Sequence, residues 1–203
     1  MTSNGPLGLM EAAETIGHHV WFERRCFEIL GSWTAELADG AIKAMVDRHA
    51  QHCAWRAGQG WDRLPVLSQV DRDGLVVAPE TPAAAMVEAL AHLTAPVERV
   101  AGAYRVAFPR LADRYRSHLS RTSRLSDGPT IRTMTMLLAD LEADWREGEV
   151  TLHGLLTSPT ETHAAADTVA RLETILVDAS PAVIRPVRSA SVPSGQSDAA
   201  PPG

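Results

Sequence analysis

The sequence predicts an all-α protein built around an antiparallel four-helix bundle, and three observations lead to that prediction. Apolar residues recur at three- and four-residue spacing along most of the chain, which is typical of amphipathic helices. The stretches nearest to a strand, VLSQV and GLVVA around 66–78, lie in a connection rich in Pro, Asp and Gly. The length of 203 residues suits one domain with a sizeable buried core.

The first helix is predicted at about 7–31 and the second at about 35–60, where the chain reaches Pro65 and cannot continue as a helix. The segment 62–81 between the second and third helices is longer than most bundle connections. We therefore expect it to cross from one end of the bundle to the other or to cover one end as a lid.

The third helix is predicted over about 83–120. Pro96 and Pro109 lie inside this range, and proline removes a backbone hydrogen bond from the helix that it interrupts. The third helix is therefore expected to be kinked or broken.

The fourth helix follows the turn Ser126-Asp127-Gly128-Pro129 and is predicted to run to about 156, and a shorter fifth helix is predicted at 160–178. Beyond Asp178 the composition changes to Pro, Ser, Ala and Gly. We expect residues 1–178 to form a single helical domain and residues 179–203 to be a disordered tail.

Composition narrows the range of partners and compartments. The net charge of −6 repels phosphate backbones, so no nucleic acid is expected as a partner. No stretch approaches a membrane-spanning length, so no membrane is expected either. The two cysteines, Cys26 and Cys53, make neither a disulfide framework nor a CxxC motif, and a reducing cytoplasm is the compartment consistent with them.

Several ionisable residues fall on the apolar stripes that face the predicted core when each residue is advanced by about 100°. They come from three helices, near the middle of each: Glu23, His49, His52, Arg56, Glu98 and Arg105. The stripe of the fourth helix has no central carboxylate. Asp144 borders it, and a modest rotation of that helix would bring Asp144 and Glu147 inward.

An unpaired charge in such a place costs several kcal/mol, so these groups must pair, coordinate a metal ion or become neutral. Glu23 can pair with Arg56 or Arg105, and the two histidines can be hydrogen-bonded core residues. The acidic residues of the fourth helix can also form a solvated face; these are Asp140, Asp144, Glu147 and Glu149.

This arrangement resembles the ferritin-like di-iron carboxylate superfamily, in which two helices each supply a Glu and two supply an ExxH motif. The corresponding positions are Glu23, an HxxH in place of the first ExxH (His49 and His52), Glu98, and a DxxE in place of the second (Asp144 and Glu147). Neither ExxH is intact. The stretches WFERRCFEILG, RHAQHCAWRAGQGWDRLPVL and LADLEADWREGE are also similar to an actinobacterial group of ferritin-like proteins.

The resemblance implies a ferritin-like bundle with an iron site, di-iron or mononuclear, in which Mn or Zn are alternatives. It implies a metal-dependent oxidoreductase acting on a small molecule, with Glu23 and His49 as catalytic residues. The implied ligands are first Glu23, His49, His52 and Glu98, and then Asp144 and Glu147.

Two other functions remain open. In a metal-free bundle the same residues form a Glu–His–Arg network, in which Arg56 and Arg105 bind a small anionic ligand or His49 carries a proton. A purely structural or interaction protein needs neither chemistry. Exposed apolar positions on the fifth helix also make a homodimer an open alternative.

Overall fold

The structure, a computed structural model, describes residues 6–178, and this part of the chain consists of helices and loops without a β-strand. The all-α prediction is confirmed. In chain order the helices are α1 (Leu9–Trp33), α2 (Gly40–Trp61), α3 (Thr81–Ala91), α4 (Pro96–Gly102), the π-helix η1 (Ala103–Ala107), α5 (Phe108–Arg121), α6 (Gly128–Leu155) and α7 (Pro159–Asp178).

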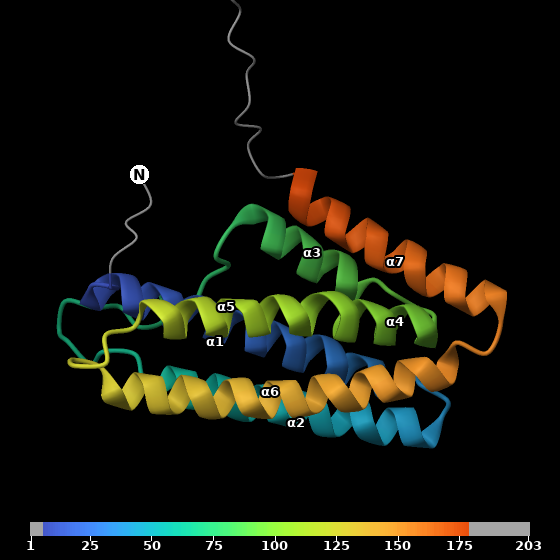
Figure 1. Cartoon of the computed structure of the whole chain (residues 1–203), viewed down its shortest axis with the longest axis horizontal. Coiled ribbons are helices and arrows are strands. Elements are labelled where there is room, and N and C mark those ends of the chain that lie inside the picture. The colour runs from blue at the N-terminus through green and yellow to red at the C-terminus, as the bar shows by residue number, and fades with distance from the viewer. Residues whose placement is uncertain (1–5, 179–203) are drawn as a thin grey trace, which may run out of the picture.

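Four long helical rods lie side by side in Figure 1, the third of which is α4, η1 and α5 in succession. The helices α1 and α2 form one antiparallel pair, and α5 and α6 form another. The pairs meet where α1 contacts α5 and where α2 contacts α6. The last helix, α7, packs on α3 and α4, so it lies outside the four rods.

The second helix begins later than predicted, at Gly40, because Asp39 caps it. The Asp39 carboxylate accepts hydrogen bonds from the backbone N–H groups of Ala41 and Ile42, both at 2.9 Å. Such a cap satisfies N–H groups that have no partner in the first turn of a helix.

The predicted third helix is broken, as its two prolines indicated. The first helical segment ends at Ala91, and Pro96 opens α4. The π-helical turn η1 ends at Ala107, shortly before Pro109. Proline has no backbone N–H, so one hydrogen bond of the helix is missing there. A π turn holds more residues than an α turn, so it changes which side chains face the core.

The long connection between α2 and α3 lies against the outside of α1. The Leu75 carbonyl sits so close to Gly17 that a Cβ at that position would overlap it. Arg72 anchors the same connection, since its guanidinium stacks 4.4 Å from the centre of the Trp61 ring and donates to the Trp61 carbonyl at 2.5 Å. The connection is therefore held against α1 at Gly17 and against α2 at Trp61.

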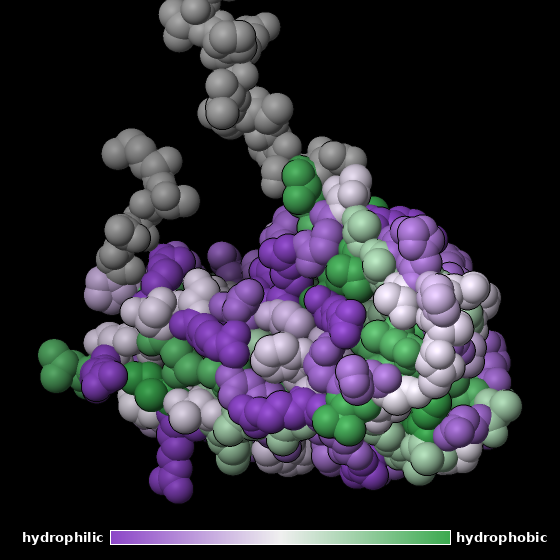
Figure 2. All heavy atoms as spheres, turned by 45° about the vertical axis from the view of Figure 1, so that its right-hand side comes forward, coloured by the Kyte–Doolittle hydropathy of each residue, from purple (hydrophilic) through white to green (hydrophobic). Residues whose placement is uncertain are grey.

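The apolar stripes of the helices meet in one core, which includes Trp33, Met86, Phe108, Met134 and Leu137. Figure 2 shows hydrophilic side chains between separate hydrophobic groups on one face of the surface. No helix within residues 6–178 has both the length and the apolar character needed to cross a bilayer. The predicted tail, 179–203, lies outside the described residues, and the homodimer stays a prediction.

Candidate functional site

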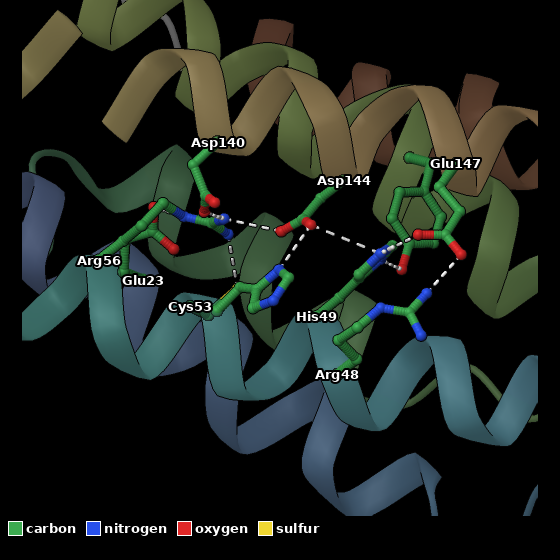
Figure 3. A network of polar contacts seen from close by, with 10 residues as sticks. Glu23, Arg48, His49, Cys53, Arg56, Asp140, Asp144 and Glu147 are labelled. Atoms are coloured by element: carbon green, nitrogen blue, oxygen red, sulfur yellow. Dashed lines mark hydrogen bonds and ion pairs between the residues drawn. The ribbon is translucent and has the colours of Figure 1, made fainter. Parts of the chain in front are cut away.

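A fully buried arginine lies at the centre of a charged cluster between α1, α2 and α6. The Arg56 Nε donates to Glu23 Oε1 at 2.7 Å, and its Nη1 donates to Asp140 Oδ2 and to Asp144 Oδ2, both at 2.7 Å. Its Nη2 contacts Cys53 Sγ at 3.1 Å. One guanidinium therefore faces three carboxylates (Figure 3).

The Glu23 carboxylate depends on two donors for its compensation in the core. Besides the Arg56 bond, the Tyr115 hydroxyl donates to Glu23 Oε1 at 2.9 Å, while Oε2 has no hydrogen-bond partner within residues 6–178. Burial raises the pKa of Glu23, and the Arg56 guanidinium and the Tyr115 hydroxyl oppose that rise. The charge on Glu23 is thus tied to the presence of Arg56.

The cluster carries more negative than positive charge. Glu23, Asp140 and Asp144 share the single guanidinium of Arg56, so two negative charges remain when all three carboxylates are ionised. A group of like charges at this spacing is costly unless a further cation or proton compensates it. One divalent cation would therefore neutralise the net charge of the cluster.

Three side chains are placed to hold such a cation. His52, Asp140 and Asp144 each offer one ligand atom, and these three atoms lie within 4.8 Å of one another. The His52 Nδ1 lies 2.8 Å from Asp144 Oδ1, while Arg56 donates hydrogen bonds to the Oδ2 atoms of both aspartates. The side chains of His52 and Asp140 are 39% and 32% exposed, so this group opens towards the surface between α2 and α6.

His49 connects the cluster to a second set of polar groups. Its Nε2 lies 3.2 Å from Glu147 Oε2, and its Nδ1 lies 2.7 Å from the Tyr104 hydroxyl. The Arg48 guanidinium holds the pKa of Glu147 below its usual value, so Glu147 is an acceptor, and burial lowers the pKa of His49. A neutral His49 then donates from Nε2 and accepts at Nδ1 from the Tyr104 hydroxyl.

Tyr104, in the π turn η1, reaches His49 from the core side. It is fully buried in η1, and its ring lies directly against Gly148 of α6, where any Cβ would overlap the ring. Burial raises the pKa of the Tyr104 hydroxyl well above its usual value, which keeps it protonated as a donor. The hydrogen-bond chain from Glu147 through His49 to Tyr104 therefore links the bundle surface to its interior.

The structure brings together six of the residues that the sequence singled out. They are Glu23, His49, His52, Arg56, Asp144 and Glu147, and they meet between α1, α2 and α6. Of the two pairings open to Glu23, the one with Arg56 is present. Of the two acidic residues that a rotation of the fourth helix would bring inward, Asp144 is buried and Glu147 is half exposed.

Two candidates lie elsewhere. Glu98 stands in the first turn of α4 and lines a cavity beside α7 with His163 and Arg171. Arg105, predicted on the core side, is 38% exposed and pairs with Glu149. The break before Pro96 and the π turn reset the helix phase, so an unbroken 100° rotation assigned these two residues to the wrong side.

Residues that the sequence did not place at the site also contribute to it. Asp140 was assigned to a polar side, yet it stands one turn before Asp144 and shares Arg56 with it. The i, i+4 spacing of the two aspartates is the signal that could have paired them. Nothing local marked Tyr104 or Tyr115, since each lies on an apolar stripe where an aromatic residue is ordinary core.

A second buried polar pair lies between α1 and α5. His19 Nε2 and His118 Nδ1 are 3.1 Å apart, and the other nitrogen of each ring is buried without a partner in the described residues. Burial lowers the pKa of His118 to about 4 and also lowers the pKa of His19. Both imidazoles are therefore neutral in the folded protein at neutral pH.

We expect the free energy of unfolding to fall as the pH drops from about 6.5 towards 4. Over this range the unfolded chain binds a proton at position 118 that the folded protein excludes, so acid favours unfolding. The full shift corresponds to about 3 kcal/mol. Urea unfolding of the wild type and of His118→Gln at pH 7 and pH 4.5 measures it. Equal pH dependence in both proteins would contradict the assignment.

A comparison of the chain with known protein families, with curated proteins and with solved structures finds no match. The residues and contacts described above are therefore the basis for any functional assignment.

Proposed function

We propose that the protein is a ferritin-like helical bundle that binds one divalent transition-metal ion through His52, Asp140 and Asp144 and acts as an oxidoreductase on a small molecule. The observation that carries this proposal is the convergence of three ligand atoms within 4.8 Å beside a cluster with excess negative charge. One imidazole and two carboxylates suit Fe(II), Mn(II) or Zn(II), and iron suits the proposed reaction.

The geometry favours one metal ion rather than two. Glu23, which would be a ligand of a di-iron centre, is bonded to Arg56, so a guanidinium provides positive charge where a second cation would be needed. Glu98, the other expected carboxylate ligand of the third rod, lines a different cavity. Arg56 thus takes over the charge compensation that a second iron ion provides in a di-iron bundle.

The residues around the proposed ligands orient them. Arg56 fixes the Oδ2 atoms of Asp140 and Asp144, and His49 Nε2 lies 3.5 Å from Asp144 Oδ1. When bound, a metal of this class supplies Lewis acidity and, in the case of iron, an oxidation–reduction couple. The half-exposed Glu147 next to His49 provides a route by which a proton reaches the buried side of the site.

A metal-free acid–base protein is the second candidate. It is favoured by the completed hydrogen-bond chain from Glu147 through His49 to Tyr104, which needs no cation. Capture of an anion by Arg56 has less support, because three carboxylates already surround that guanidinium.

Metal binding by the intact protein tests the proposal. We expect one Fe(II), Mn(II) or Zn(II) ion per chain by calorimetric titration and elemental analysis, and at least about tenfold weaker binding in His52→Ala and in Asp140→Asn. His92→Ala is the matched control, because His92 is exposed and distant from the ligands in sequence. Absence of saturable binding, or equal binding by His52→Ala and the wild type, would sink the metal proposal and leave the acid–base candidate.

A further inference from the structure

A groove on the outer side of α1 and α5 is distinct from the charged cluster. It consists of a cavity of about 380 Å³ and a cavity of about 100 Å³, and Arg114 and Ser117 of α5 line both. On α1, Phe22 lines the larger cavity, and His18 and His19, one turn earlier, line the smaller one. Because Arg114 and Ser117 form a wall of both, and because His18, His19 and Phe22 lie within about one turn of α1, the two cavities adjoin each other.

The larger end is lined by apolar residues together with charged ones, Glu80 and Asp113 among them. Phe22 and Met86, both fully buried, line it together with Leu176 of α7. The arginines at this end are in ion pairs, Arg114 with Glu80 and Arg110 with Glu173. This end of the groove therefore offers an apolar surface with balanced charge around it, which suits the hydrocarbon part of a ligand.

The smaller end has the opposite character. Three imidazoles, two guanidinium groups and two hydroxyls line it, and no carboxylate does. The His19–His118 pair contributes in a defined way. Two neutral rings joined by one N–H···N bond leave one N–H donor and one lone pair on their remaining nitrogens, which have no partner in residues 6–178. Arg114 and Arg121 pair with Glu80 and Glu11, so it is the set of N–H and O–H donors at this end, and not a surplus of positive charge, that favours an oxyanion.

We propose that this groove binds a small carboxylate with an apolar chain, the carboxylate at the histidine end and the chain at the Phe22–Met86 end. The proposal rests on the change of chemistry along the groove and is independent of the metal site. Arg114 is the principal anchor, because it stands at the junction of both cavities and its side chain is partly exposed. The larger cavity has the size of small-molecule sites in proteins.

Octanoate, below the concentration at which it forms micelles, is the probe. We expect 1:1 binding to the full chain by calorimetric titration, with acetate and 1-octanol each at least tenfold weaker, since one lacks the chain and the other the charge. The imidazole resonances of His19 and His118 should shift on binding, and those of His49 and His52 should not. Absence of saturable octanoate binding, equal binding of 1-octanol, or shifts only at His49 and His52 would overturn the proposal.

Two pairs of variants keep the test independent of folding. Ser117→Trp places a large ring at the junction and should abolish octanoate binding, whereas Ser120→Trp, one turn further along the exposed side of α5, should not. Arg114→Gln should weaken octanoate at least tenfold, and Arg146→Gln, on an exposed part of α6, should leave it unchanged. Wild-type affinity in both Ser117→Trp and Arg114→Gln would show that octanoate binds outside this groove.

Discussion

Replacing Arg56 by Met is expected to destabilise the protein by about 3–5 kcal/mol, the range typical of losing one partner from a buried ion pair. The substitution leaves Glu23, Asp140 and Asp144 facing one another without their common cation. Glu23 is affected most, because it is fully buried and, of the two hydrogen bonds that its Oε1 accepts from Arg56 and Tyr115, only the second would remain. Urea unfolding at pH 7 measures the effect.

Arg116→Met is the control for this experiment. Arg116 is 45% exposed and forms ion pairs with Asp113 and Glu142, so its loss should cost less than about 1 kcal/mol. Addition of Zn(II) should stabilise Arg56→Met more than the wild type, since the divalent cation then replaces the missing positive charge. A cost at Arg56 no larger than at Arg116 would show that the buried network does not stabilise the fold.

Gly148→Ala is the second substitution with a large expected effect. The added methyl group would overlap the ring of Tyr104, which is fully buried and bonded to His49 through its hydroxyl. Neither the ring nor α6 can move without disturbing the core, so we expect a loss of about 2–3 kcal/mol, typical of an overpacked core. Thermal unfolding gives the loss in stability, and the pKa of His49 from NMR reports whether its bond to Tyr104 survives.

Gly154→Ala on the same helix separates this overlap from the effect of alanine on helix formation. A Cβ at Gly154 meets nothing within 4 Å, so the substitution should stabilise the protein by up to about 1 kcal/mol. Opposite signs at the two glycines would locate the constraint at Tyr104. A neutral Gly148→Ala would show that the π turn adjusts without cost.

The helices of this protein could be predicted because their signals are local. The first and last helices were placed to within about two residues of their ends, and Pro96 and Pro109 indicated where the predicted third helix is interrupted. The three- and four-residue spacing also placed Glu23, His49 and Arg56 on inward stripes. A helical stripe is a property of one segment, so the sequence shows which residues are buried without showing what they touch.

The partners of those residues depended on the rotation of each helix about its own axis. Within the π turn at Ala103–Ala107, Tyr104 is buried and Arg105, its neighbour in the chain, is partly exposed. The rotation of α6 brings Asp140 and Asp144 to one guanidinium. A change of one residue in helix phase moves a side chain by about 100°, which decides between core and surface.

Sequence alone therefore determined an all-helical chain with charged and imidazole groups directed into its interior. Only the tertiary structure decided that Arg56 lies against Glu23, and that the three side chains that could hold a cation, His52, Asp140 and Asp144, meet nearer the surface. The physical reason is the cost of burying charge: it requires that every such group find a partner, but helix packing selects which one.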